Sequence, residues 1–245
     1  MRTSWTDMHQ ARQSVKPPQQ PLTRRLIVTI DGPAGSGKST VARKLASHLG
    51  YLYLDTGALY RAVAWKAKTA GVAPTNTAAV VALLPSIKIS MEQTSNGMKV
   101  SVNNQDITDY IRTPEISFFA AHVSAIPDVR KWLLPQQRDV GAKGGIVAEG
   151  RDLGTVVFPQ ADVKFFLEAD VNTRVKRRQH ELAAAGQASK QVADTKRHIE
   201  DRDERDRSRE VAPLVPAKDA LVIDTSTLTV DQVIDRMMST ISAKL

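Results

Sequence analysis

The sequence predicts an α/β fold in which a parallel sheet is wound by helices and carries a small antiparallel β insertion. Three observations lead to this prediction. Residues 32–39, Gly-Pro-Ala-Gly-Ser-Gly-Lys-Ser, satisfy the phosphate-loop spacing G-x-x-x-x-G-K-[ST]. An apolar β-branched run precedes this octet at 26–30, and a helical apolar stripe follows it. Strand and helix patterns then alternate along the chain, which is typical of a parallel sheet with crossover helices.

The octet predicts that the chain binds a nucleoside triphosphate. Gly32, Gly35 and Gly37 allow the backbone to curl so that successive N–H groups face a chain of phosphates. Lys38 is expected to reach the β- and γ-phosphates, and the hydroxyl of Ser39 is expected to ligate Mg²⁺. A flexible Gly/Ser turn is the alternative interpretation, which the strand–loop–helix context disfavours.

The periodicity of apolar residues predicts the elements in order. Strands are expected at 26–30, 51–55, 145–149, 163–167 and 220–224, and helices at 39–48, 57–70, 77–84, 115–125, 128–140, 171–185, 189–209 and 231–243. Gly71 and Gly186 are expected to stop the helices that they follow. Pro135 predicts a kink or a split in the helix at 128–140.

Between 86 and 112 the apolar pattern changes to strict alternation. Residues 87–91 and 98–102 alternate apolar and polar side chains, with a turn at 94–97 between them. Alternation is typical of a sheet with one face in water, unlike the continuous apolar runs of buried parallel strands. A small antiparallel hairpin is therefore expected as an insertion in the parallel core.

The charge balance is strongly basic, with 34 Lys and Arg against 26 Asp and Glu and a net charge of +8. A nucleic-acid-binding protein is one interpretation of this surplus. Aromatic residues make up only 5% of the chain, however, and no zinc-finger, RRM or homeodomain spacing occurs. A site for two nucleotides also needs many arginines, because several phosphates face one another there. We therefore expect small nucleotides, and no nucleic acid, as partners.

Composition also bounds where and how the chain works. Its 245 residues include no cysteine, which excludes a disulfide framework and a thiolate metal site. No apolar run approaches the ~20 residues of a membrane span, so no membrane partner is expected. Residues 1–23 are polar and basic and are expected to form a disordered tail; a transit peptide is the alternative, but the tail lacks an apolar stripe. A cytoplasmic monomer is expected.

Four acids follow apparent strands, namely Asp31, Asp55, Glu149 and Asp152. Ligands bind at the carboxyl ends of the strands in open α/β sheets, and an acid there can hold the hydrated Mg²⁺ of a triphosphate. A helix cap or turn acid is the alternative for each one. The sequence leaves open which of them supports the metal.

The stretch 196–209 is dense in arginine and has two interpretations. Asp201–Arg205 and Asp203–Arg207 have the i,i+4 spacing of solvated surface ion pairs. Offsets of four and seven instead put Arg202, Asp206 and Arg209 on one face of one helix. Such a converging set suits a ligand with a phosphate and hydroxyl groups, because Arg binds phosphate and Asp accepts from hydroxyls.

Four segments in order resemble the bacterial cytidylate kinases, a family of P-loop nucleoside monophosphate kinases. They are the phosphate loop, Asp-Thr-Gly-Ala-Leu-Tyr-Arg at 55–61, Glu-Gly-Arg-Asp-Leu-Gly-Thr-Val-Val-Phe-Pro at 149–159, and the stretch 202–209 followed by Val-Ala-Pro-Leu at 211–214. The resemblance runs from about residue 24 to the C-terminus and includes the β insertion. It implies a kinase domain at 24–245, with a core at 24–71 and 144–245, a nucleotide-binding insertion at about 72–143 and a helical lid at about 170–205.

The resemblance implies ATP-dependent phosphorylation of CMP and dCMP, with Mg²⁺ bound together with ATP. The implied ATP-binding residues are Gly32, Pro33, Ala34, Gly35, Ser36, Gly37, Lys38, Ser39 and Thr40. In the CMP site, Thr56, Arg61, Arg151 and Arg209 would hold the phosphate, Arg202 and Asp206 the sugar, and Arg130 and Asp152 the base. The implied catalytic residues are Lys38, Arg174, Arg178 and Arg209, with Arg174, Arg177 and Arg178 in the lid.

Transfer by direct in-line attack needs no nucleophilic side chain and no general base, because the attacking phosphate oxygen of CMP is already anionic. One position departs from the family. A Ser that contacts the base is usual where this chain has Ala121. His122, Ser124 or a water are the candidates to replace that hydroxyl, and the sequence does not choose among them.

Other functions of a phosphate-loop protein fit less well. A shikimate or thymidylate kinase would lack the long β insertion and the loop at 150–154. A nucleic-acid-dependent ATPase would also explain the phosphate loop and the basic charge. A GTP-driven switch is disfavoured because no N-K-x-D segment occurs.

Overall fold

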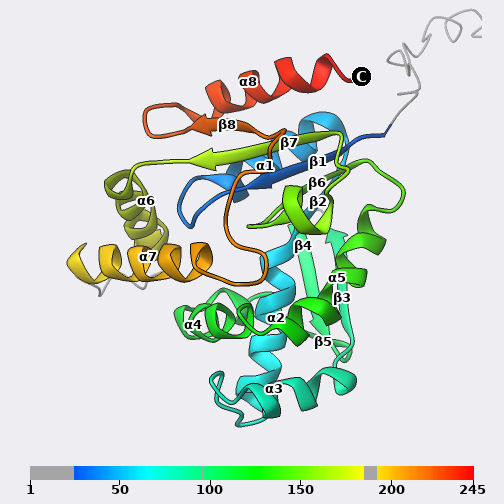
Figure 1. The fold of residues 1–245 in the computed structure, drawn as a ribbon, viewed down its shortest axis with the longest axis vertical. Coiled ribbons are helices and arrows are strands. Elements are labelled where there is room, and N and C mark those ends of the chain that lie inside the picture. The colour runs from blue at the N-terminus through cyan, green and yellow to red at the C-terminus, as the bar shows by residue number, and fades with distance from the viewer. Residues whose placement is uncertain (1–24, 95–96, 185–191) are drawn as a thin grey trace, which may run out of the picture.

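The computed structural model describes residues 25–94, 97–184 and 192–245. The predicted tail at 1–23, half of the predicted turn at 94–97 and the expected helix stop at Gly186 lie outside the described residues. The described chain forms a parallel-sheet body, a second body of helices with a hairpin, and a helix pair at one side (Figure 1).

The parallel-sheet body confirms the predicted fold class. Its strands are β1 (Ile27–Asp31), β2 (Leu52–Asp55), β6 (Ile146–Glu149), β7 (Val163–Glu168) and β8 (Leu221–Asp224). They lie in the order β2-β6-β1-β7-β8, and each neighbouring pair is parallel. Because β1 is the central strand, the segments that follow β1, β6 and β7 all leave from the middle of one sheet edge.

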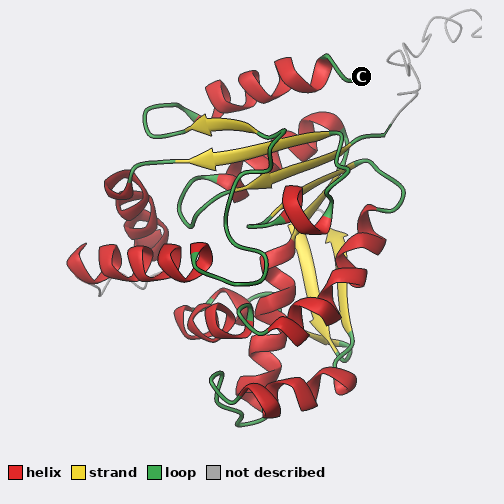
Figure 2. Cartoon of the chain, in the orientation of Figure 1, coloured by secondary structure: helices red, strands yellow, loops and turns green. Residues whose placement is uncertain are grey.

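Two helices cover this sheet and complete its core. They are α1 (Lys38–Leu49) and α8 (Val230–Ser242), seen in Figure 2 beside the strands. Val41 and Leu45 of α1 and Met237 and Ile241 of α8 are almost fully buried in one apolar cluster with the strands. Thr229 and the third residue of α8 form a capping box that fixes where α8 begins.

The second body has its own apolar core. It contains α2 (Thr56–Thr69), α3 (Thr77–Leu83), α4 (Pro114–Val123), α5 (Pro127–Gly141), β3 (Ile89–Thr94), β4 (Gly97–Val102) and the short β5 (Gln105–Asp106). The order β3-β4-β5 is antiparallel, as expected. The sequence did not predict β5, which follows a tight turn where Asn103 and Asn104 take φ values of 51° and 67°. The sequence predicted a kink or a split at Pro135, and α5 continues through Pro135 as one helix, so it is not split there.

The helix pair is formed by α6 (Val171–Ala184) and α7 (Val192–Arg207), which contact each other beside the sheet edge (Figure 1). α7 was expected to run to about 209, but it ends at Arg207. Short turns lie at Leu84–Ser86, Tyr110–Arg112 and, in π-helical form, Leu153–Val157. None of the helices in the described part of the chain is long and apolar enough to span a membrane.

Candidate active site

The phosphate loop lies between the end of β1 and the start of α1, as its sequence predicted. Gly32 has a φ of +143°, and a Cβ there would lie 2.1 Å from the carbonyl oxygen of Leu167. Gly35 and Gly37 take φ values of +76° and +91°, which other residues rarely adopt. The three glycines are therefore required by the curl of the loop, a curl of the kind that presents backbone N–H groups to a phosphate.

Lys38 is held inside this loop. Its Nζ donates to the carbonyl oxygen of Pro33 at 2.6 Å and to Oγ of Ser36 at 3.3 Å, and the residue is only 5% exposed. Burial lowers the pKa of Lys38, and the nearby charge of Arg151 lowers it further. A desolvated ammonium group that faces a second cation favours the binding of an anion.

A hydrogen bond from Ser39 joins the start of α1 to the end of β6. Its hydroxyl donates to Oε2 of Glu149 at 2.8 Å, while Tyr53 of β2 donates its hydroxyl to Oε1. Burial raises the pKa of Glu149, and the charge of Asp55 raises it further. Mg²⁺ prefers oxygen ligands of this kind. Ser39 and Glu149 therefore fit a Mg²⁺ ion that arrives with a triphosphate.

The structure distinguishes the four acids that follow the strands. Asp31 accepts two backbone N–H groups and Asp55 caps α2, so both match the alternative interpretation as turn and cap acids. Asp152 forms an ion pair, and Glu149 is the acid that bonds Ser39. Over the described ranges, no group of three or more His, Cys, Asp or Glu side chains could hold a metal ion.

Five arginines lie near one another beside the phosphate loop, namely Arg61, Arg151, Arg178, Arg202 and Arg209. Burial, followed by repulsion from the other four, lowers the pKa of Arg202 to about 9. Burial, followed by repulsion from Arg130 and Arg151, lowers the pKa of Arg209 to about 10. Such mutual repulsion is relieved when an anion binds among the cations.

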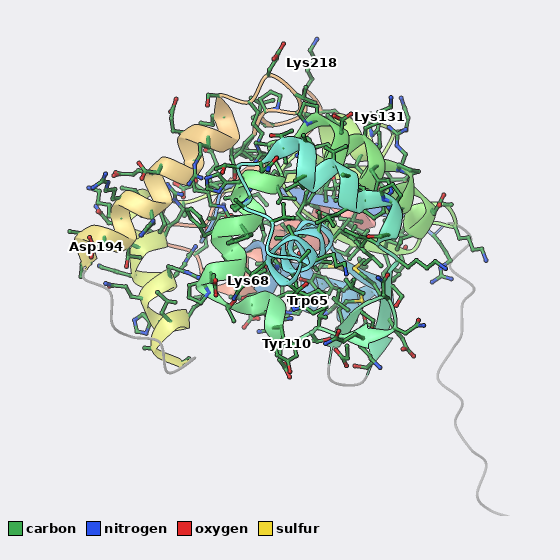
Figure 3. The ribbon with its side chains drawn as sticks, turned by 90° about the horizontal axis from the view of Figure 1, so that it is seen from below. Trp65, Lys68, Tyr110, Lys131, Asp194 and Lys218 are labelled. Carbon is green, nitrogen blue, oxygen red and sulfur yellow. The ribbon has the colours of Figure 1, made fainter. Side chains whose placement is uncertain are left out.

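Asp206 is the shared acid of this cluster. Nε of Arg151 donates to Oδ2 of Asp206 at 3.1 Å, Arg209 donates to Oδ1, and Nε of Arg202 lies 3.9 Å from Oδ2. Asp206 is buried, and its contacts with the three guanidinium groups orient them. One carboxylate among these three arginines leaves a positive surplus there. The charged side chains of Lys131, Asp194 and Lys218 instead point outward at the periphery (Figure 3).

The remaining phosphate candidates lie at the start of α2. Thr56 Oγ1 donates to the carbonyl oxygen of Glu149 at 2.8 Å, and Arg61 pairs with Asp55. The Nε of Arg61 is buried and has no hydrogen-bond partner in the part of the chain that the structure describes. A buried donor without a partner is costly, and an anionic ligand would satisfy it.

The structure of α7 contradicts the interpretation of Asp203 as part of a surface ion pair. Asp203 is 4% exposed and pairs with Arg174 of α6, not with Arg207. Nε of Arg205 donates to the carbonyl oxygen of Asp201 at 3.0 Å. The predicted single-helix face is also incomplete, because Arg209 lies beyond the end of α7 and reaches Asp206 from there.

Arg130 and Asp152, the two residues that the resemblance assigns to the base, lie together in the structure. Both are buried, they form an ion pair, and the guanidinium carbon of Arg130 lies 5.4 Å from the centre of the Tyr60 ring. Arg130 also donates through Nη1 to the carbonyl oxygen of Ser124 at 3.0 Å. The hydroxyl of Ser124 donates to the carbonyl oxygen of Ala121 at 3.2 Å.

The three predicted lid arginines have different partners. Arg174 is buried, pairs with Asp203 and donates to the carbonyl oxygen of Ala34 in the phosphate loop at 3.3 Å. Arg178 is 38% exposed and pairs with Glu181 at 2.9 Å. Arg178 is therefore more accessible to a ligand than Arg174 is.

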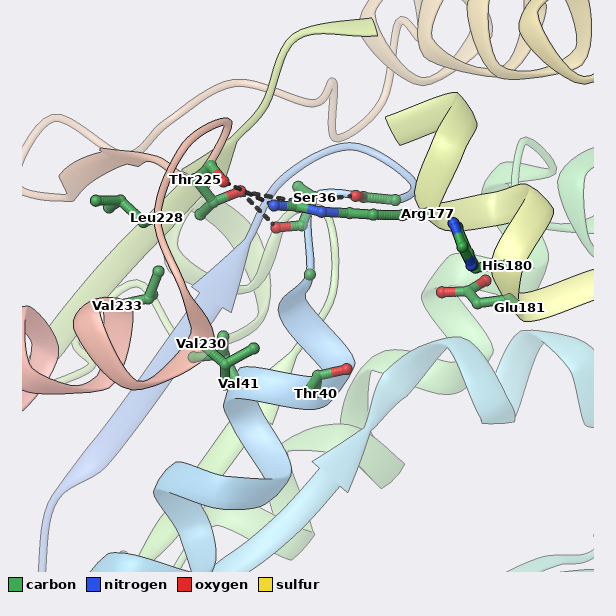
Figure 4. Close-up of a pocket in the computed structure, with 12 residues that line it drawn as sticks. Ser36, Thr40, Val41, Arg177, His180, Glu181, Thr225, Leu228, Val230 and Val233 are labelled. Carbon is green, nitrogen blue, oxygen red and sulfur yellow. Dashed lines mark hydrogen bonds between the residues drawn. The ribbon is translucent and has the colours of Figure 1, made fainter. Parts of the chain in front are cut away.

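Arg177 lines a cavity of about 320 Å³ beside the phosphate loop (Figure 4). Its Nη1 and Nη2 donate to Oγ1 and the carbonyl oxygen of Thr225 at 3.0 and 2.7 Å. Leu228, Val230 and Val233 form an apolar part of its wall, and the polar side chains of Thr40, His180 and Glu181 also line it. A pocket that combines an apolar wall with one guanidinium suits a flat aromatic base.

Sequence patterns missed Tyr53, Asp203 and Thr225. Thr225 follows the last strand, so its place at the carboxyl edge of the sheet is the signal that could have found it. Tyr53 lies in an apolar strand run, and Asp203 has the spacing of a surface ion pair, so no local signal marks either one.

Comparison with known proteins gives a consistent set of matches. A family model described as cytidylate kinase matches residues 28–243. A cytidylate kinase of Geobacter sulfurreducens is 48% identical over 216 residues, which are 88% of this chain and 92% of that protein. A cytidylate kinase of Syntrophotalea carbinolica is 45% identical over 223 residues, 91% of this chain and 94% of that protein. A bifunctional pantoate ligase/cytidylate kinase of Synechococcus sp. is 48% identical over 217 residues, 88% of this chain and 44% of that protein.

Proposed function

The chain belongs to the cytidylate kinase family, and from that premise we propose how its residues perform the ATP-dependent phosphorylation of CMP and dCMP. The chain is a nucleoside monophosphate kinase. The observation that carries the proposal is the opposition of cations across one site, where Lys38 of the phosphate loop lies within the field of Arg151 and Arg202. Two phosphate-bearing nucleotides, one on each side, would balance these charges.

ATP occupies the side of the phosphate loop in this proposal. The loop residues bind its phosphates, and its base enters the cavity beside Arg177 and Thr225 (Figure 4). Ser39 and Glu149 would hold Mg²⁺, which would supply charge neutralisation on the phosphates when bound with ATP.

CMP occupies the side of the arginine cluster. Its phosphate lies among Thr56, Arg61, Arg151 and Arg209, and its sugar faces Arg202 and Asp206, as the family resemblance implies for these positions. The Nε of Arg61, which has no hydrogen-bond partner among the described residues, and the lowered pKa of Arg209 support the phosphate assignment.

The base of CMP is recognised by Asp152 and Arg130. A carboxylate accepts a hydrogen bond from the exocyclic amine of cytosine and repels the O4 carbonyl of uracil. The ion pair between Asp152 and Arg130 orients this carboxylate.

Phosphoryl transfer then depends on positioning and on charge neutralisation. The anionic phosphate oxygen of CMP attacks the γ-phosphorus in line, and the bond to the β,γ-bridging oxygen breaks, so that ADP leaves. Lys38, Arg178 and Arg209 stabilise the charge on the transferring group. Arg174 is bound to Asp203 and to the loop, so its contribution is to hold α6 and α7 against the phosphate loop.

The test is an assay of the full chain with ATP and Mg²⁺ across CMP, dCMP, UMP, AMP and dTMP. ADP formation is followed by a coupled assay, and the diphosphate product is identified by chromatography. We expect the highest kcat/KM with CMP and dCMP. ATP turnover that depends on added DNA or RNA, and not on CMP, would contradict the proposal. One chain supplies every residue named here, so a monomer is expected to suffice, and a cytoplasmic location stays a prediction.

A further inference from the structure

Asp31 joins two loops that serve opposite substrates in the proposed function. It is the last residue of β1, and the next residue, Gly32, begins the phosphate loop. Its Oδ1 accepts the N–H of Leu153 at 2.9 Å and its Oδ2 accepts the N–H of Gly154 at 2.8 Å. The side chain is 4% exposed, so these two bonds are shielded from water.

The two bound amides follow directly after the two side chains assigned to CMP. Arg151 and Asp152 occupy the positions immediately before Leu153 and Gly154. A third bond holds the start of the same loop, because the N–H of Gly150 donates to the carbonyl oxygen of Ile30 at 3.0 Å. The end of β1 therefore determines where the loop at 150–154 lies.

From this geometry we propose that Asp31 is a positioning residue, which fixes the CMP-binding loop at 150–154 in register with the phosphate loop. The inference rests on the proposed function and goes beyond it, because that function assigns Asp31 to neither substrate. In-line transfer requires donor and acceptor to be aligned within a fraction of an ångström. A carboxylate that precedes the phosphate loop and binds the loop at 150–154 provides this alignment before either nucleotide binds.

The chemistry of the carboxylate explains why this side chain suits the position. Two N–H groups need two acceptor oxygens, and Asp supplies both on a short, rigid side chain. Asn would place one NH₂ group against an N–H donor, and an apolar residue would leave two buried N–H groups without partners. Burial and the charge of Asp152 disfavour the carboxylate, and the two backbone bonds and the charge of Lys38 offset this effect in part.

The experiment compares Asp31→Asn with a matched control, Asp162→Asn. Asp162 accepts the N–H of Ile27, at the other end of β1, through Oδ2 at 2.8 Å. For each full-length variant we would measure kcat/KM for CMP and UMP at saturating ATP, the Kd of ADP by calorimetry, and thermal unfolding.

For Asp31→Asn we expect kcat/KM for CMP to fall about 10–100-fold, the scale of a misplaced reacting group, with the preference for CMP over UMP reduced about 10-fold. The Kd of ADP should change by less than about threefold, because the phosphate loop keeps its own contacts. Asp162→Asn should lower the melting temperature while it leaves the CMP-to-UMP ratio unchanged.

A preference for CMP that is the same in Asp31→Asn as in the wild type would overturn the inference, as would an equal loss in the control. If Asp31→Asn does not fold, Asp31→Ser, which keeps one acceptor oxygen, takes its place and should give the same pattern. Failure of both variants to fold would assign Asp31 to the fold alone and overturn the inference. Absence of CMP-dependent turnover in the wild type would instead reject the proposed function together with it.

Discussion

Several groups of the site are held by hydrogen bonds or ion pairs with buried residues before a nucleotide binds. Tyr53 and Ser39 fix the two oxygens of Glu149, Arg130 fixes Asp152, and Asp206 is shared among three arginines. These contacts lower the cost of ordering the side chains when a substrate arrives. Substitutions at single residues should therefore separate catalysis, base choice and metal support from folding.

Lys38→Met tests the role of the loop cation. We expect kcat to fall by about 10²–10³-fold, corresponding to ~3–4 kcal/mol of lost transition-state stabilisation. Stability should be unchanged or slightly increased, because burial already disfavours the charge of Lys38. Steady-state kinetics and thermal unfolding measure the two effects. A folded variant with near-normal kcat would be inconsistent with a catalytic Lys38.

Asp152→Asn tests the choice of base. The amide can donate to O4 of uracil as well as accept from the amine of cytosine, so the CMP-to-UMP ratio of kcat/KM should fall. The loss for CMP should be about 1.5–3 kcal/mol, the scale of a charged hydrogen bond. Asp139→Asn, at an exposed position of α5, is the control. An unchanged ratio would shift base discrimination to another residue, with Arg130 the next candidate.

Ala121→Ser tests the one position that departs from the family pattern. A hydroxyl restored on α4 should improve kcat/KM for CMP by about 0.5–1.5 kcal/mol, the contribution of one neutral hydrogen bond. The same assay across CMP and UMP measures it. Weaker CMP turnover would mean that this side of the pocket is packed differently and that the base assignment from the resemblance is wrong.

At the scale of elements, α7 has two roles. Asp203 ties it to α6, and Asp206 organises the arginine cluster. Both acids are buried, whereas Arg205 between them is exposed. The burial of two acids explains why a stretch with the charge density of a surface helix lies against the rest of the protein.

Arg209→Met and Arg205→Met separate the inward and outward charges of this region. The Arg209 side chain is 9% exposed and bonds Asp206, so its loss should cost about 1.5–3 kcal/mol in kcat/KM for CMP, as for other charged hydrogen bonds. Arg205→Met should stay within about 0.5 kcal/mol, as expected of a surface charge. Equal and small effects at both positions would favour a purely solvated helix.

At the scale of the whole molecule, stability should depend on pH through Asp31. Burial, the largest cause, raises the pKa of Asp31 from 3.8 to about 6. The native state therefore binds the proton more tightly than the unfolded chain does, and stability falls as pH rises through this range. Between pH 5 and pH 7 the wild type should lose about 1 kcal/mol more unfolding free energy than Asp31→Asn. Denaturant titrations at both pH values measure the difference, and parallel pH profiles would argue against a raised pKa.

Local sequence patterns were sufficient to predict the parallel strands, the phosphate loop and the antiparallel hairpin. Each is encoded within a short window, as a run of apolar residues, a glycine spacing or an alternation of period two. The same local logic failed for β5, whose two residues are too few to show a period, and for Asp203, whose neighbours in sequence suggest a surface pair. The family resemblance, not periodicity, supplied most residues of the CMP site.

The sequence by itself determined that this chain has a phosphate loop on an α/β core and the motifs of a cytidylate kinase. Tertiary structure alone decided that Glu149 is the acid beside Ser39, that Arg202 and Arg209 repel one another in one cluster, and that Asp31 binds amides more than 120 residues away. The physical reason is that burial and charge depend on distances in space. Those distances are set when β1 takes the centre of the sheet, and no window of neighbouring residues contains them.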